Sequence, residues 1–234
     1  MFIPSRSWGE DIAIDSSLVK RNLNFVKEKI AHYNIKIIAV TKYFGLKAMQ
    51  AGYEAGLRDF AESRAIEAIQ KIEQLPEYIR QNSTFHFIGH LQSNKADKVV
   101  RHFDVIHSVD SFKIAQAISK SACSLNKKEK ILLQVNNAGE EQKSGYEKEQ
   151  LRQEFEKLLA LEGVDIIGLM NMAPLGAEEE TLEKLFTDIR QFRDELEEKF
   201  NITLPELSMG MSDDYVVAAR CGATMVRIGR KLFT

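Results

Sequence analysis

The chain has 234 residues, enough for one large domain or two small ones with a substantial buried core. Hydrophobic residues make up 44% of it and charged residues 28%, a composition typical of soluble globular proteins. The net charge of −2 gives no long-range attraction to nucleic acid or to an anionic membrane. Because the N-terminal stretch lacks the apolar core of a signal peptide, we expect a soluble protein of the cytoplasm.

Short apolar runs alternate with longer amphipathic segments along the chain. The expected strands are 37–41, 59–61, 85–88, 105–109, 131–135, 165–169, 206–209 and 225–228. The segments between them carry apolar residues at helical spacing, such as Ile66, Ile69 and Ile72. A further helix is expected at about 11–31, and the acidic run 178–180 is expected to open the longest helix.

Eight strands that alternate with helices indicate either a closed (β/α)8 TIM barrel or an open, doubly wound sheet. The count favours the barrel, and no GxGxxG sequence follows the first strand to favour the open sheet. No Pro-rich or Ser-rich linker divides the chain. We therefore expect an α/β fold with a single barrel domain over residues 1–234.

Lys42 directly follows the first expected strand, whose small and β-branched residues suit a strand buried on both faces. An amine at the rim of a core loses solvation, which lowers its pKa and frees its lone pair. Such a lysine can form a Schiff base with an aldehyde substrate or with pyridoxal phosphate. The alternative is an ordinary strand-end lysine that extends its amine into water. This stretch alone leaves both readings open.

The loops after the seventh and eighth strands of a barrel often bind phosphate, together with a helix N-terminus. In this chain they offer glycines, hydroxyl groups and a cation. The candidate phosphate-binding residues are Ser208, Gly210, Ser212, Gly229 and Arg230. A helix is expected to begin near Asp213, so Ser212 also suits the N-cap, with Asp213 and Asp214 in the first turn. Both roles are compatible, provided that the anion stays clear of these carboxylates.

Arg227 lies inside the apolar eighth strand, where an unpaired guanidinium is costly. It therefore needs an anionic partner or an acceptor on a ligand. Next to a pyridine ring, an arginine would pair with the unprotonated nitrogen and weaken the ring as an electron sink. The alternative is a structural ion pair with Glu62 or Asp110.

The remaining polar and sulfur-containing residues give weaker signals. His86 and His90 flank the end of the third strand without a carboxylate at ligand spacing, so no metal site is expected. Both are expected to be satisfied histidines of the core or rim. Cys123 and Cys221 lie far apart and form no CxxC pair, so no disulfide framework is expected. Met170 is expected to fill space at the barrel rim, where it could also pack on a flat ring.

Motifs along the chain resemble one family when they are taken together. The matching stretches are AVTK at 39–42, ES at 62–63, HFIGHLQSNK at 86–95, HSVDS at 107–111, LQVN at 133–136, KSGY at 143–146, GLMNMAP at 168–174, LSMGMSDDY at 207–215 and GATMVRIGRKLF at 222–233. In collinear order they resemble the YggS/PROSC family of pyridoxal-phosphate-binding homeostasis proteins, over about residues 37–233.

The resemblance implies a barrel of the alanine-racemase N-terminal type, fold type III among pyridoxal-phosphate proteins. It implies that the barrel holds pyridoxal 5′-phosphate (PLP) for vitamin B6 homeostasis without robust catalysis of its own. Lys42 would then carry the cofactor as a Schiff base, and Arg227 would meet the pyridine nitrogen. The phosphate candidates would hold the phosphate, with Ser63 and Met170 near the ring.

The chain departs from the family pattern at two places. Residues 61–63 read AES where the family usually has GEN, so Ala61 and Ser63 replace a glycine and an asparagine. The contact that this asparagine would make with the cofactor ring is therefore in doubt. Arg230 follows Gly229 where many members have Thr or Ser, so the amide and the guanidinium would replace a lost hydroxyl. Lys95 is expected to be a solvated helix residue, with a transient cofactor contact as the alternative.

Racemases of this fold type add a C-terminal β-domain that brings a second acid–base group into a dimeric active site. This chain ends at Thr234, soon after the eighth strand, so we expect a monomeric carrier that hands PLP to PLP-dependent apoenzymes. Three other functions stay open. They are a PLP-dependent racemase or lyase, an aldolase in which Lys42 bonds the substrate directly, and a regulatory module that acts through a partner protein.

Overall fold

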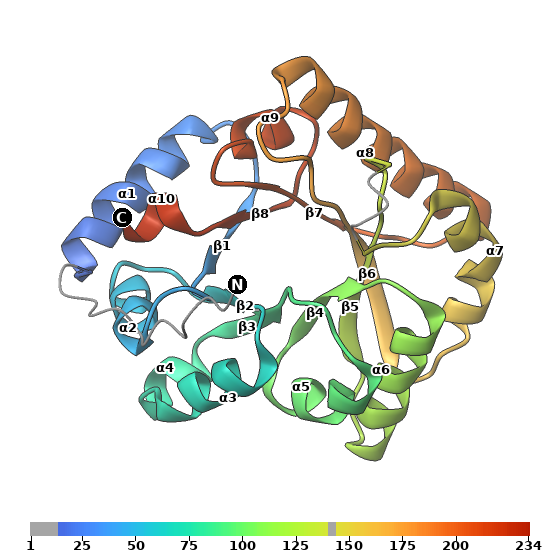
Figure 1. The fold of residues 1–234 in the computed structure, drawn as a ribbon, viewed down its shortest axis with the longest axis horizontal. Coiled ribbons are helices and arrows are strands. Elements are labelled where there is room, and N and C mark those ends of the chain that lie inside the picture. The colour runs from blue at the N-terminus through green and yellow to red at the C-terminus, as the bar shows by residue number, and fades with distance from the viewer. Residues whose placement is uncertain (1–13, 140–143) are drawn as a thin grey trace, which may run out of the picture.

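The computed structural model describes residues 14–139 and 144–234, which form a closed barrel of parallel strands (Figure 1). Neighbouring strands pair in chain order, and β1 pairs with β8 to close the sheet. The strands are β1 Lys36–Val40, β2 Asp59–Glu62, β3 Thr84–Phe87, β4 Val105–Val109, β5 Glu129–Gln134, β6 Val164–Met170, β7 Glu206–Met211 and β8 Met225–Ile228. The expected barrel is therefore confirmed, with every strand end within two residues of its predicted position.

Helices surround the barrel and cover the outer face of the sheet (Figure 1). They are α1 Ser16–Lys29, α2 Leu46–Glu54, α3 Ala65–Gln74, α4 Glu77–Gln81, the 3-10 helix η1 Ser93–Lys95, α5 Ala96–His102, α6 Phe112–Ser124, α7 Lys148–Leu159, α8 Glu179–Phe200, α9 Tyr215–Arg220 and α10 Arg230–Phe233. The longest, α8, buries a stripe that includes Phe186, Ile189 and Leu196, as its helical spacing requires. No helix in the described ranges is both long and apolar enough to cross a membrane.

The predicted helix ends need two corrections. The helix expected near Asp213 begins at Tyr215, and Asp214 rather than Ser212 occupies its N-cap position. The Asp214 carboxylate accepts a hydrogen bond from the Met211 amide instead, which tightens the turn between β7 and α9. The first helix begins at Ser16, and residues 11–13 of its predicted range lie outside the described residues. The acidic run does open the longest helix, since α8 begins at Glu179.

The inside of the barrel differs in character from its outside. Along each strand, side chains point alternately to the helices and to the barrel interior. The outward set forms one large apolar core with the helices. The interior holds only small apolar clusters, one of them built from Ile38, Val40, Ala61 and Met225. The remaining interior includes the buried polar side chains of His86, His107, Ser208 and Arg227.

Candidate functional site

Lys42 stands where β1 gives way to the loop that leads into α2. The strand pairing continues one residue past β1, because the Thr41 amide donates to the Ala61 carbonyl at 3.0 Å. Lys42 is half-buried, and its Nζ lies 5.0 Å from the centre of the Tyr43 ring. Since this is the carboxyl end of the strand, the amine lies on the side of a barrel where functional groups usually gather.

The loop that carries Lys42 is fixed from outside the barrel by a buried lysine. Lys71 of α3 donates to the carbonyl oxygens of Thr41 at 3.0 Å and Phe44 at 2.8 Å. Its ammonium also contacts the Glu62 carboxylate at 2.6 Å, and that carboxylate accepts the Thr41 hydroxyl at 2.7 Å. Both charged side chains are about 5% exposed. The backbone on both sides of Lys42 is therefore held by a hydrogen-bonded ion pair, which we call the Lys71 brace.

Arg227 is buried inside the barrel, as its place in the strand predicted. Its Nη1 donates to the Ser208 carbonyl at 2.7 Å and to the Ser208 hydroxyl at 2.8 Å. Its Nη2 donates to the Asn171 carbonyl at 2.8 Å. Burial lowers the pKa of this guanidinium to about 10, although the Asp214 carboxylate counteracts part of the effect. Arg227 thus remains a cation near neutral pH and is held by neutral oxygens.

The ion pair that the sequence offered as an alternative for Arg227 is wrong. Glu62 is engaged by Lys71 on the outer face of β2. Asp110 faces His90 at the rim instead, with its Oδ2 at 3.4 Å from the imidazole Nδ1. Adjacent residues of a strand face opposite sides of the sheet, and the outward position of Glu62 puts it out of reach of an inward-facing arginine.

Ser208 is wholly buried, and its hydroxyl is engaged within the protein. Besides Arg227, it contacts His107, whose Nδ1 lies 2.9 Å from the hydroxyl oxygen. His107 in turn contacts His86, and His86 contacts Asp59. His86 is therefore a satisfied core histidine, as predicted. No sequence pattern singles out His107, and only the barrel register brings these two histidines together.

The remaining phosphate candidates cluster where β7 and β8 end. The Ser212 hydroxyl accepts a hydrogen bond from the Gly229 amide at 3.3 Å, so the two loops are in contact. The Arg230 guanidinium is exposed and lies 3.3 Å from the Asp213 carboxylate. Gly210 has a φ of +90°, and a Cβ there would lie 2.6 Å from that of Ala218. This glycine is thus required by the turn and by the packing of α9.

Two more predicted residues lie at the carboxyl ends of two other strands, β2 and β6. Ser63 directly follows β2 and is half-buried, and its carbonyl would lie 1.9 Å from a Cβ added to Gly89. The loops after β2 and β3 therefore touch only because Gly89 has no side chain. Met170, at the end of β6, is buried in the interior with Val105 and Leu132, which confirms its packing role.

An unsatisfied buried atom next to Arg227 indicates that a ligand fits this region. The side chain of Asn171 is 1% exposed, and its Nδ2 donates to Asn137 Oδ1 at 3.2 Å. Its Oδ1 has no hydrogen-bond partner among the described residues. Buried polar atoms are rarely left unpaired in the absence of a ligand or water. No group of three His, Cys, Asp or Glu side chains that could hold a metal ion occurs within the described ranges.

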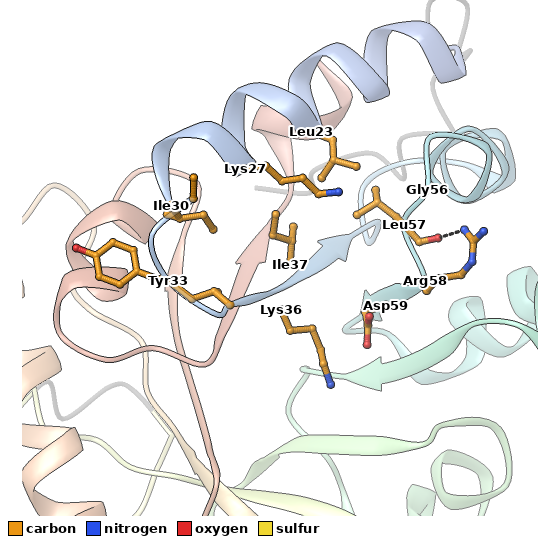
Figure 2. Close-up of a pocket in the computed structure, with 12 residues that line it drawn as sticks. Leu23, Lys27, Ile30, Tyr33, Lys36, Ile37, Gly56, Leu57, Arg58 and Asp59 are labelled. Atoms are coloured by element: carbon orange, nitrogen blue, oxygen red, sulfur yellow. Dashed lines mark hydrogen bonds between the residues drawn. The ribbon is translucent and has the colours of Figure 1, made fainter.

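A pocket of about 480 Å³ lies at the opposite end of the barrel, between α1 and the starts of β1 and β2 (Figure 2). Its lining includes Leu23, Lys27, Lys36, Arg58 and Asp59. None of the predicted cofactor-binding residues is among those that line it. The two ends of the strands thus have different surroundings, and the sequence-based candidates all belong to the other end.

Comparisons with known proteins agree with this architecture. The family model for the N-terminal domain of alanine racemase matches residues 14–234. A pyridoxal phosphate homeostasis protein from Synechocystis sp. is 43% identical over 86% of this chain and 91% of its own length. One from Aquifex aeolicus is 38% identical over 85% of this chain and 86% of that protein.

Solved structures give the same result. PipY of Synechococcus elongatus, solved with PLP bound, has a TM-score of 0.84 and 38% identity, covering 92% of this chain and 100% of PipY. An alanine racemase from Clostridium difficile has a TM-score of 0.75 at 20% identity over 94% of this chain and 57% of the racemase, a likeness of fold alone. The chain therefore belongs to the alanine racemase N-terminal domain family and, within it, to the pyridoxal phosphate homeostasis proteins.

Proposed function

We propose that this chain binds PLP at the carboxyl ends of its strands, with the aldehyde held by Lys42 as a Schiff base. The observation that carries the proposal is the half-buried Lys42 amine at the end of β1, on a loop fixed by the Lys71 brace. The PLP-bound structure of PipY supports the cofactor, and the names of the relatives support a role in homeostasis. The bound group supplies an aldehyde that condenses with an amine and releases water.

Arg227 is the proposed partner of the pyridine nitrogen. A guanidinium has five N–H groups, and the contacts with Ser208 and Asn171 use three of them. The others are available to an acceptor on a ligand. Because Arg227 stays protonated near neutral pH, the nitrogen that it meets stays unprotonated, which makes the ring a weak electron sink. This property favours a carrier over a racemase or lyase.

The phosphate group is proposed to lie against the contact between the β7 and β8 loops. Ser212, Gly229 and Arg230 supply a hydroxyl, backbone amides and a guanidinium there. Gly210 shapes the turn that presents them. Ser208 is proposed to act differently from the original expectation, by holding Arg227 rather than the phosphate, since its hydroxyl is buried and engaged. Ser63 and Met170 are proposed to lie near the ring.

An absorption spectrum with chemical trapping tests this proposal. We expect the purified protein, incubated with PLP, to show a visible band that borohydride abolishes. Peptide mass mapping then places the reduced adduct on Lys42. Lys42→Ala abolishes the adduct, whereas Lys47→Ala, which removes a nearby exposed lysine, keeps it. A wild-type protein that stays colourless and unmodified contradicts the proposal and favours an aldolase-type lysine.

The proposed role is that of a cytoplasmic, monomeric carrier that passes PLP to PLP-dependent apoenzymes. Amino acids added to the loaded protein distinguish this role from enzymatic catalysis. We expect no racemised or cleaved amino acid, and we expect activation of an added apoenzyme at a rate set by PLP release. Sedimentation gives the oligomeric state. Turnover of an amino acid that disappears in Lys42→Ala would make the protein an enzyme.

A further inference from the structure

Five polar side chains form a continuous chain of hydrogen bonds through the barrel interior. Asp59 Oδ1 lies 3.0 Å from His86 Nε2, and His86 Nδ1 lies 2.9 Å from His107 Nε2. His107 Nδ1 lies 2.9 Å from the Ser208 hydroxyl oxygen, which accepts from Arg227 Nη1 at 2.8 Å. The strands β2, β3, β4, β7 and β8 each contribute one member. We call this set the interior chain.

The interior chain runs between two different parts of the molecule. Asp59 begins β2, and its side chain is 20% exposed at the pocket that lies between α1 and the strand starts (Figure 2). The other members are each at most 4% exposed. Arg227, at the far end, meets Asn171 next to the proposed cofactor site. The interior chain thus connects the cofactor site with the opposite end of the barrel.

When both histidines are neutral, the chemistry of the two ends fixes the direction of every bond. A guanidinium only donates, so the Ser208 oxygen accepts from Arg227, and the Ser208 hydroxyl donates its hydrogen bond to His107 Nδ1. His107 must then carry its proton on Nε2 and donate to His86 Nδ1. His86 likewise carries its proton on Nε2 and donates to the Asp59 carboxylate, which only accepts.

The reverse direction fits the structure poorly. It would need a protonated Asp59 or a doubly protonated His86, and the Ser208 hydroxyl hydrogen would need another acceptor, which no contact among the described residues provides. A charged His107 is disfavoured as well. Its pKa lies well below the ordinary value, first because of burial and further because any positive charge on His86 and the cations Arg227 and Lys36 disfavour a second charge there. Two neutral histidines with matching tautomers satisfy all four contacts.

We infer that Asp59, His86 and His107 are positioning residues that hold Ser208 and thereby orient Arg227 toward the cofactor. The hydrogen bonds polarise one another in one direction, so the Asp59 charge increases the negative character of the Ser208 oxygen that Arg227 meets. The part that concerns the cofactor rests on the proposed function. The direction of the interior chain does not depend on it.

The first test measures the histidine tautomers in the protein without cofactor. A variant with His32→Gln, His90→Gln and His102→Gln keeps only His86 and His107 among the five histidines. In ¹⁵N spectra near neutral pH, we expect both rings to be neutral, with the proton on Nε2 and a bare Nδ1. A proton on Nδ1 of either ring, or an imidazolium, overturns the inference. This result is independent of PLP binding.

The second test removes the charge at the start of the interior chain. Asp59→Asn keeps an oxygen acceptor, and we expect roughly threefold to tenfold weaker PLP binding, the range usual for coupling through hydrogen-bonded networks. The absorption band is also expected to shift, with an unchanged melting temperature. The matched control is Asp165→Asn, which removes an exposed carboxylate near the start of β6. Equal binding by the two variants contradicts the positioning role.

The outcomes separate the two proposals. If the tautomers are as stated and the wild-type protein binds no PLP, the proposed function fails and the direction of the interior chain stands. If PLP bonds to Lys42 and the tautomers run the other way, the interior chain as inferred here is wrong and the proposed function stands.

Discussion

Lys42 and Arg227 are anchored by two different kinds of polar structure. The loop that carries Lys42 is fastened from outside the sheet by the Lys71 brace, a buried ion pair between α3 and β2. Arg227 is fastened from inside the barrel by a hydroxyl and two carbonyl oxygens, all without formal charge. The buried cation is Lys71 in the brace and Arg227 in the barrel interior. Only Lys71 contacts a carboxylate directly.

The difference matters for the chemistry at the mouth of the barrel. A carboxylate directly paired with Arg227 would compete with a ring nitrogen for its hydrogens. Neutral acceptors leave the cation largely uncompensated, so its charge acts on whatever ligand it meets. In the Lys71 brace, the Lys71 ammonium on α3 and the Glu62 carboxylate on β2 neutralise each other. The brace therefore fixes the backbone beside Lys42 without adding a net charge at the mouth of the barrel. The two anchors should therefore respond differently to substitution.

The largest expected effect is that of breaking the Lys71 brace. Lys71→Met removes the ammonium that the buried Glu62 carboxylate and two carbonyls share, and we expect a loss of roughly 3–5 kcal/mol in the free energy of unfolding. Urea unfolding measures it. Lys71→Met combined with Glu62→Gln should recover part of the loss, and the exposed Lys47→Met serves as a control. A loss below about 1 kcal/mol would mean that the brace acts like a surface ion pair.

A second buried carboxylate shows what happens when an ion pair is less well satisfied. Glu129, at the start of β5, is wholly buried and meets the Lys127 ammonium at 2.6 Å. Burial outweighs this contact and raises the pKa of the carboxyl from 4.5 to about 7. Glu62, in contrast, accepts hydrogen bonds from both Lys71 and Thr41. The comparison predicts that Glu129 makes stability depend on pH.

The sign of this dependence follows from proton binding. Between pH 4.5 and about 7, the folded protein binds more protons at Glu129 than the unfolded chain does. The free energy of unfolding therefore decreases as the pH rises through this window, by roughly 3 kcal/mol at 1.36 kcal/mol per pKa unit. We expect Glu129→Gln to remove this decrease in urea unfolding across pH, whereas the exposed Glu162→Gln keeps it. An unchanged pH profile in Glu129→Gln contradicts the assignment.

The parts of the site that the sequence predicted are those that depend on the strands. Each strand end is marked by the close of an apolar run, so the positions of Lys42 and Arg227 follow from local pattern. The Lys71 brace does not follow from any local sequence pattern. The isoleucine stripe predicted the buried face of α3, yet Ile66 is 43% exposed while Lys71 is 6% exposed. A buried lysine makes sense only once the neighbouring strand places a carboxylate against it.

The interior chain was beyond sequence analysis for a similar reason. His86 and His107 are separated by twenty-one positions and belong to different strands. Their contact depends on the register of β3 against β4, where His86 pairs with Val105 and Phe87 with Ile106. The shift of a strand by one residue would turn these side chains to the other face of the sheet. Register in a closed barrel is set by all eight strands together, so no local motif encodes it.

The smallest effect on stability is expected from Arg227→Lys, a substitution inside the barrel. A lysine keeps the charge but lacks the planar fork that reaches Ser208 and Asn171 together. One buried carbonyl then loses its donor, at about 1–2 kcal/mol in urea unfolding. Because an ammonium still donates to the Ser208 hydroxyl, the histidine tautomers should stay the same while PLP binding weakens.

The matched control for this variant is Arg230→Lys, since the exposed pair of Arg230 with Asp213 should change stability by less than about 0.5 kcal/mol. If Arg227→Lys instead cost as much as breaking the Lys71 brace, the neutral oxygens around Arg227 could not be its main support. The buried Asp214 carboxylate, whose charge raises the pKa of Arg227, would then have to carry that role. The two anchors would in that case be of the same kind, and Arg227 would have less unpaired charge to offer a ring nitrogen.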